Sequence, residues 1–196
     1  MSFDESFCDG AMVALVASAF FVFIINMLKA ETQPPRAAWL AWTLVDGVTG
    51  ASMLAKGVMN AQLATVVLGA VITTLILCFM KAKGPLVRMD KIGLGAAVVG
   101  MGLWLITSEP MVALAISLGV TMIGGVLAGK ASWKSPKGDD RVARTLWACA
   151  SSLVLMSTLA NRERTFAQLA EPAAFTVMDV GLAIIIWCRW PLRQQA

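Results

Sequence analysis

The sequence predicts an all-α integral membrane protein with seven transmembrane helices, built as two parallel three-helix bundles joined by a linker helix (3+1+3). Of the 196 residues, 58% are hydrophobic and only 14% are charged, whereas a water-soluble domain carries about 25% charged residues. Seven apolar segments approach the length that crosses a bilayer, and lysine and arginine are concentrated in alternate connections between them. These observations indicate a multi-pass membrane protein.

The spans are predicted from the length of each apolar segment, because a helix that crosses the hydrocarbon needs about 20 mostly apolar residues. The seven predicted spans cover residues 10–28, 37–55, 61–80, 92–108, 110–129, 145–160 and 172–188. The sixth span is short and has to borrow residues at its ends, from Arg144 and Asn161. The pairs Glu109-Pro110 and Glu171-Pro172 are expected to open the fifth and seventh helices, since proline suits the first helical position and an acid suits the positive end of the helix dipole. All seven prolines are thereby expected at or between helix ends.

The orientation follows from counting the basic residues on each side. Thirteen of the 16 lysines and arginines follow the first, third, fifth and seventh spans, and only Lys56, Arg162 and Arg164 fall on the other side. The positive-inside rule then predicts that the N-terminus lies outside and the C-terminus lies in the cytoplasm. The acidic start MSFDESFCDG lacks the basic region of a cleaved signal peptide, so the first span is expected to stay as an anchor.

The composition also argues against several kinds of site. Histidine and tyrosine are absent, which excludes imidazole base catalysis and histidine-built haem or metal sites. The four cysteines show no CxxC spacing, and no nucleophile is accompanied by a base, so we expect neither a metal, a cofactor nor an enzyme activity. The net charge of +4 lies in short connections between spans, which fits membrane topology better than nucleic-acid binding.

An internal repeat is indicated by the motif Arg-x-x-Trp. Arg36 and Trp39 enter the second span, and Arg144 and Trp147 enter the sixth, at an offset of 108 residues. The offset maps the first three spans onto the last three. A single membrane domain of residues 1–196 is therefore predicted, with bundles at 10–80 and 110–188 and a linker helix at 92–108. The alternative is that each pair is only an interfacial anchor.

Residues 89–156, from MDKIGLG to SSLVLM, resemble the second half of bacterial seven-helix proteins that are similar to the SWEET and PQ-loop superfamily. The shared pattern is an aspartate opening the linker helix, a tryptophan near its outer end, a proline-led fifth helix, a basic loop with proline and a tryptophan-bearing sixth helix. The order Gln33-Pro34 reverses the Pro-Gln dipeptide, and both the hinge prolines and the Asn and Trp sugar-binding pair of SWEET transporters are missing. The resemblance implies the fold and transport of a small solute, without sugar specificity.

Two aspartates inside predicted spans are the main candidate site residues. Asp46 lies near the middle of the second span, on one helical stripe with Trp39 and Trp42. A central aspartate costs about 2.5–3.5 kcal/mol on insertion, so it is expected to face the bundle interior. Asp46 then either binds a proton, a cation or a polar solute, or is a structural carboxylate that fixes packing. The same two alternatives hold for Asp179 of the seventh span.

Weaker candidates are Asn26, near the inner end of the first span, and the tryptophans Trp39, Trp42 and Trp147, which are expected to line a cavity or to pack helices. The sequence thus predicts a transporter-like protein that binds or moves a small polar solute, with possible proton coupling, through a midplane cavity between two bundles. The alternative is a non-transporting subunit or scaffold of a larger membrane complex. Expected partners are the lipid bilayer, a small polar solute or proton, and a second copy or a membrane-complex partner, with no nucleic acid.

Overall fold

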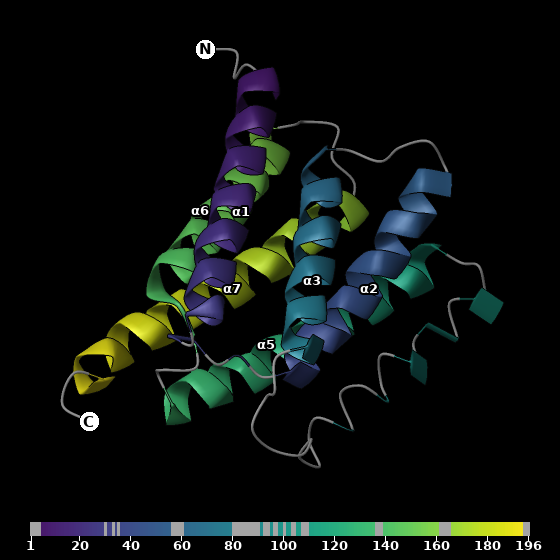
Figure 1. The fold of residues 1–196 in the computed structure, drawn as a ribbon. Coiled ribbons are helices and arrows are strands. Elements are labelled where there is room, and N and C mark those ends of the chain that lie inside the picture. The colour runs from purple at the N-terminus through teal and green to yellow at the C-terminus, as the bar shows by residue number, and fades with distance from the viewer. Residues whose placement is uncertain are drawn as a thin grey trace. The chain divides into compact units, whose positions relative to one another are not determined.

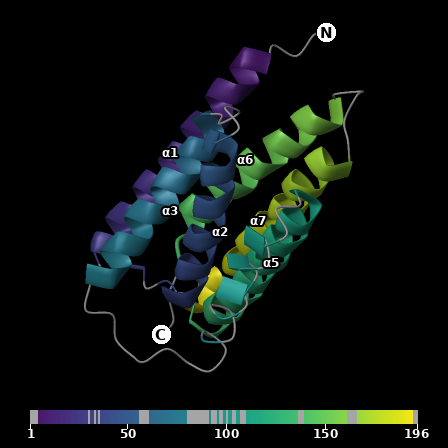
Figure 2. The same cartoon turned by 90° about the vertical axis from the view of Figure 1, so that its right-hand side faces the viewer.

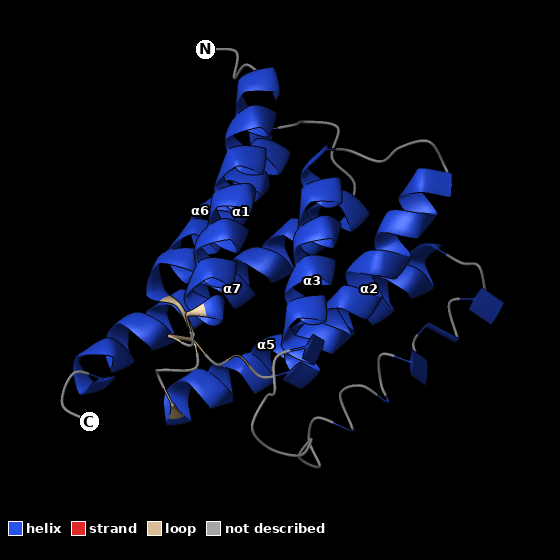
Figure 3. Cartoon of the chain, in the orientation of Figure 1, coloured by secondary structure: helices blue, strands red, loops and turns tan. Residues whose placement is uncertain are grey.

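The computed structural model shows an all-α chain in the part of the sequence that it describes (Figures 1 and 3). The described residues are 5–29, 31–32, 34, 36–55, 61–79, 91, 95, 98–99, 101–102, 105–106, 110–135, 139–160 and 166–193. Their helices are α1 (Glu5–Leu28), α2 (Arg36–Ala55), α3 (Ala61–Phe79), α5 (Pro110–Lys134), α6 (Arg141–Ala160) and α7 (Phe166–Arg193). The prediction of an all-α fold is confirmed for these residues, and most of the predicted linker helix, 92–108, lies outside them.

Three of these helices are long and apolar enough to cross a membrane. The candidate spans are Asp9–Leu28, Arg141–Ala160 and Leu169–Arg189, and Ala64–Phe79 is a shorter apolar helix. Large apolar side chains cover the outside of these helices: Phe21, Phe79 and Val177 are exposed by 67%, 85% and 69%. A surface of this kind favours contact with lipid. The chain is therefore a multi-pass membrane protein by the length and composition of its helices.

The prolines only partly follow the prediction. Pro110 is the first residue of α5, as expected. Pro172, by contrast, lies inside α7, which begins at Phe166. The prediction that every proline lies at or between helix ends is therefore wrong for Pro172. A proline removes one N–H from the helix ladder, and near an interface water can satisfy the carbonyl group that loses its partner, so α7 extends beyond its apolar stretch.

The helices group into two compact units. Unit 1 comprises Met1–Gln33 and Ala131–Ala196 and contains α1, α6 and α7. In it, α6 packs against both α1 and α7 (Figure 1). Its core is aromatic: the ring centroid of Trp147 from α6 lies 5.2 Å from that of Phe20 and 5.3 Å from that of Phe23, both from α1. These contacts join helices that are more than 100 residues apart in the chain.

Unit 2 comprises Pro34–Lys130 and contains α2, α3 and most of α5. Helix α2 lies beside α3 (Figure 2), and its Ala41 and Val45 form a buried cluster with Val120 of α5. The two units group the helices differently from the predicted triplets, because α1 packs against α6 and lies in one unit with α6 and α7. Each unit combines the first helix of one triplet with the second and third helices of the other.

The helix bounds can be compared at the offset of 108 residues on which the predicted repeat rests. Adding 108 to the bounds of α1, α2 and α3 gives 113–136, 144–163 and 169–187, close to the observed bounds of α5, α6 and α7. By the same offset, α1 of unit 1 corresponds to α5, most of which lies in unit 2. Likewise, α6 and α7 of unit 1 correspond to α2 and α3 of unit 2. A duplicated chain would group its helices in this way if α1 packed with the second half and α5 packed with the first half.

Candidate functional site

Five of the described polar residues of unit 1 gather where α6 begins. We call Asn26, Ser132, Asp139, Asp140 and Arg144 the entry cluster. Arg144, Asp139 and Asp140 are exposed by only 3%, 1% and 6%. Burying a charge costs several kcal/mol unless it is paired, so the pairing within this cluster decides whether the start of α6 is stable.

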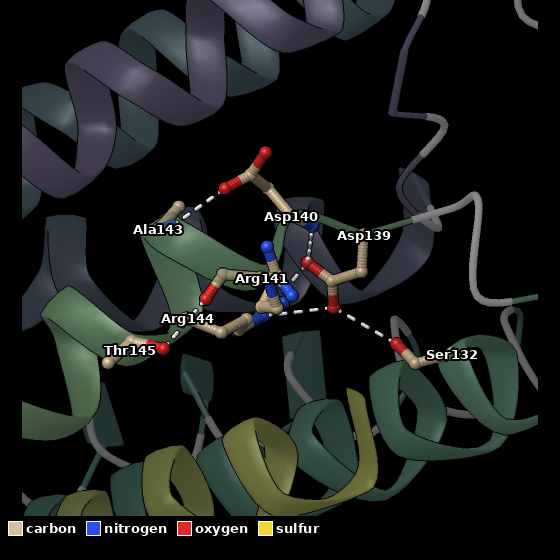
Figure 4. Close-up of polar contacts among 7 residues, drawn as sticks. All are labelled: Ser132, Asp139, Asp140, Arg141, Ala143, Arg144 and Thr145. Atoms are coloured by element: carbon tan, nitrogen blue, oxygen red, sulfur yellow. Dashed lines mark hydrogen bonds and ion pairs between the residues drawn. The ribbon is translucent and has the colours of Figure 1, made fainter. Parts of the chain in front are cut away.

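Asp139 is the centre of the entry cluster (Figure 4). The Nε atom of Arg144 lies 3.0 Å from Oδ1 and 2.9 Å from Oδ2 of Asp139. The hydroxyl of Ser132, from the last turn of α5, donates to Oδ2 at 3.0 Å. The Asp139 carboxylate thereby neutralises Arg144 and ties the end of α5 to the start of α6.

Asp140 caps α6. Its Oδ1 accepts a hydrogen bond from the backbone N–H of Ala143 at 2.7 Å, which is the geometry of an N-terminal capping residue. Its other oxygen accepts a hydrogen bond from Nδ2 of Asn26, in the last turn of α1. The positive end of the α6 dipole, together with Arg144, explains why two carboxylates are stable here. Asn26, a predicted site residue, is thus placed on the cap of α6.

A second polar group lies farther along the contact between α6 and α7. Asp179 of α7 is buried, and its carboxylate lies within hydrogen-bonding reach of the Ser151 side chain and close enough to Arg144 for Coulomb interaction. Thr176, one turn before Asp179, donates from its hydroxyl to the backbone oxygen of Ser151 at 2.9 Å. A carboxylate with hydroxyl neighbours inside a candidate span can accept and release a proton, or bind a polar group of a solute.

The remaining predicted site residues lie in unit 2, apart from Trp147 in the aromatic core of unit 1. Asp46 is half-buried at the middle of α2. Trp39 and Trp42 are buried and stack edge to face, with ring centroids 5.5 Å apart. The indole N–H of Trp42 donates to the backbone oxygen of Thr121, 3.4 Å away in α5. The structure therefore brings Trp39 and Trp42 together, and it brings Asn26 and Asp179 into unit 1.

A polar contact also joins α2 to α3 in unit 2. The hydroxyl of Thr43 donates to the backbone oxygen of Ala70 at 3.0 Å and shares a hydrogen bond of 2.7 Å with the hydroxyl of Thr74. Among the described residues, no group of three or more Cys, Asp and Glu side chains is placed to hold a metal ion. The chemistry that the described residues offer is therefore that of carboxylates, hydroxyls and one buried guanidinium.

Sequence reasoning missed Ser132, Asp139 and Asp140, because it treated residues 130–144 as a basic connection. One signal was present in the sequence. An aspartate directly before the first residue of a helix is a frequent capping residue, and Asp140 directly precedes Arg141. The pairing of Asp139 with Arg144 depends on how the connection turns, and the sequence pattern alone does not show it.

No protein-family model, no curated protein and no solved structure matches the chain.

Proposed function

We propose that the chain is a seven-helix protein of a bacterial inner membrane that binds or moves a small polar solute, and that its intramembrane aspartates carry a proton in that process. In this proposal the seven helices form a duplicated 3+1+3 chain, with the N-terminus outside and the C-terminus in the cytoplasm. The distribution of 13 basic residues against three supports the orientation. A fluorescent-protein fusion at the C-terminus, which matures only in the cytoplasm, tests it.

The main support for the proposal is the environment of the Asp179 carboxylate. This carboxylate is buried on a candidate span, next to Ser151 and within reach of the charge of Arg144. Acidic side chains inside a membrane are expensive, and they commonly mark proton relays or solute sites. Asp46, half-buried at the middle of α2, provides a second acid within a predicted span.

The test is uptake into vesicles that contain the purified chain. Radiolabelled monosaccharides, amino acids and small organic acids are offered with and without an inward proton gradient, while a pH-sensitive dye inside the vesicles reports proton entry. We expect one class to accumulate with the gradient, and we expect Asp179→Asn, alone and together with Asp46→Asn, to abolish the accumulation. Ser152→Ala is a matched control, since the Ser152 hydroxyl donates within its own helix to Ala148. Unchanged uptake in the double variant would overturn the proposed mechanism.

A second function, a non-transporting subunit of a membrane complex, is favoured by the entry cluster. Asp139 and Arg144 are both buried and hydrogen-bonded to each other, an arrangement that suits a fixed joint between helices. Extraction in a mild detergent followed by size measurement separates the two functions. A chain that is recovered only within a larger assembly, and that drives no uptake, supports the subunit.

A further inference from the structure

Two arginine–tryptophan pairs lie at the end of unit 1 where α6 begins and α7 ends. The guanidinium carbon of Arg141 in α6 lies 4.4 Å from the ring centroid of Trp187 in α7. That of Arg189 in α7 lies 4.8 Å from the ring centroid of Trp133 in α5. Both distances are within the range of cation–π attraction. We call these four residues the arginine–tryptophan collar.

Hydrogen bonds hold the collar in place. The indole N–H of Trp187 donates to the hydroxyl of Thr145 at 3.0 Å, and that hydroxyl donates to the backbone oxygen of Arg141 at 2.8 Å. The Nε–H of Arg189 donates to the backbone oxygen of Trp133 at 3.2 Å. The Arg189 guanidinium is therefore held by a hydrogen bond between helices, and the Trp187 ring that lies under Arg141 is held by its hydrogen bond to Thr145.

The collar lies at the level where the hydrocarbon region ends. The candidate spans of α6 and α7 begin at Arg141 and end at Arg189, so both arginines mark the limit of a span. Trp133 and Trp187 are exposed by 54% and 51%. Tryptophan is enriched at the headgroup level of a bilayer, because its ring is apolar and its N–H is polar.

The charge that this end of unit 1 presents outward is positive. Asp139 and Asp140 of the entry cluster are buried, and the nearby Glu31 is exposed together with Lys29. Arg141 and Arg189 are half-buried and Lys134 is exposed, so bases outnumber acids on the outside and favour an anionic partner. Guanidinium groups bind phosphate oxygens through planar, directional N–H donors.

We propose that the collar binds the headgroup phosphates of anionic phospholipids. The stacked rings hold the guanidinium planes at headgroup depth, the arginine N–H groups contact phosphate oxygens, and the net negative charge of the lipid distinguishes it from a zwitterionic one. This inference does not depend on transport, because it concerns the lipid surface of unit 1 alone.

The experiment is a titration of the detergent-solubilised full chain with short-chain phosphatidylglycerol, short-chain phosphatidylcholine or inorganic phosphate, with thermal unfolding as the readout. We expect phosphatidylglycerol to raise the unfolding temperature, and the other two to have little effect. A basic residue near an anionic surface contributes about a fivefold change in affinity. The variant with Arg141→Gln and Arg189→Gln should therefore bind phosphatidylglycerol about 25-fold more weakly.

Two further variants test the role of the stacked planes. Lys134→Gln removes one exposed charge near the collar but no arginine–tryptophan pair, so it should weaken binding by no more than about fivefold, the effect of a single charge. Arg141→Lys with Arg189→Lys keeps both charges but loses the planar groups, and its affinity should fall between those of the wild type and the glutamine variant. Equal losses in Lys134→Gln and in the glutamine variant, full affinity in the lysine variant, or equal stabilisation by inorganic phosphate would each overturn the proposal.

Discussion

Arg144 and Asp139 are five residues apart in the sequence, yet the Nε atom of Arg144 contacts both carboxylate oxygens of Asp139 at 3.0 and 2.9 Å. Asp139 precedes α6, and Arg144 lies in the first turns of that helix. The pair therefore fixes the turn that leads into α6. Because both side chains are buried, neither charge can rely on water if the other is removed.

We predict that Asp139→Ala lowers the free energy of unfolding by about 3–5 kcal/mol, the cost of leaving a buried charge uncompensated. Unfolding by increasing sodium dodecyl sulfate in mixed micelles measures this. The matched control is Asp139→Leu combined with Arg144→Met, which removes both charges and should recover most of the loss. If Asp139→Ala alone is as stable as the wild type, the pair contributes no stability.

Asp140 should behave differently from Asp139, because its main role is to cap α6. We predict that Asp140→Ala lowers the free energy of unfolding by about 1–2 kcal/mol, whereas Asp140→Asn costs far less, since asparagine caps helices about as well as aspartate. The same micelle unfolding series measures both. Adding Asn26→Ala to Asp140→Ala should cost little more, because the two side chains hydrogen-bond to each other. Fully additive losses would contradict this coupling.

The sequence predicted the helices well where apolar length defines them, and less well at their ends. Helix α5 continues to Lys134, beyond the predicted limit of 129, and α7 begins at Phe166 rather than at Pro172. Hydropathy detects only the part of a helix inside the hydrocarbon. The backbone hydrogen bonds continue into the interface, where charged side chains are solvated.

The candidate site was predicted only in part. Asp179 was found because a carboxylate inside an apolar segment is conspicuous. Asp139 was missed, because its burial results from tertiary contacts with Ser132 and Arg144. The partners of Trp147 were missed as well, since Phe20 and Phe23 are two among many apolar residues of α1 and nothing in their spacing indicates a contact with α6.

Helix α5 passes closer to α2 at Gly124 than a side chain allows. A Cβ atom placed on Gly124 would clash with Nε1 of Trp42 and lie 2.8 Å from its Cε2, whereas a Cβ atom on Gly119 of the same helix would meet nothing within 4 Å. We predict that Gly124→Ala costs about 1–3 kcal/mol through overpacking, and that Gly119→Ala is tolerated. Thermal unfolding of both variants, together with the near-ultraviolet signal of tryptophan, measures this. Equal stability of the two variants would show that Trp42 moves aside without cost.

A substitution at Asp179 can distinguish an effect on transport from an effect on stability. We predict that Asp179→Asn, which preserves shape and hydrogen bonding beside Ser151, keeps the unfolding temperature of the wild type but loses gradient-driven uptake. If the carboxylate were purely structural, Asp179→Asn would lower the unfolding temperature. Uptake by the protein that stays folded would then still depend on the proton gradient. Thermal unfolding and vesicle uptake, measured on the same preparations, distinguish these outcomes.

Two polar contacts can be compared at the offset of 108 residues on which the predicted repeat rests. The offset of 108 places Thr43 of α2 at the position of Ser151 in α6. The Thr43 hydroxyl contacts α3 through Ala70 and Thr74, and Ser151 accepts a hydrogen bond from Thr176 of α7. In both halves, then, the same position of the second helix makes a polar contact with the third helix. The hydrophobic effect does not drive helices together in lipid, so a polar contact of this kind helps to hold the two helices together.

The grouping of α1 with α6 and α7 predicts how a divided chain behaves. A cut within residues 81–90 separates α1, α2 and α3 from α5, α6 and α7, and it thereby removes Phe23 of α1 from Trp147 of α6. We predict that each half expressed alone is degraded, and that the two halves expressed together are purified as a complex. Trp147→Ala in the second half should reduce the yield of the complex, whereas Phe79→Ala in the first half should not, because Phe79 is exposed by 85%. Two halves that are each stable alone and do not bind one another would instead support sequential bundles, in which α1 packs with α2 and α3.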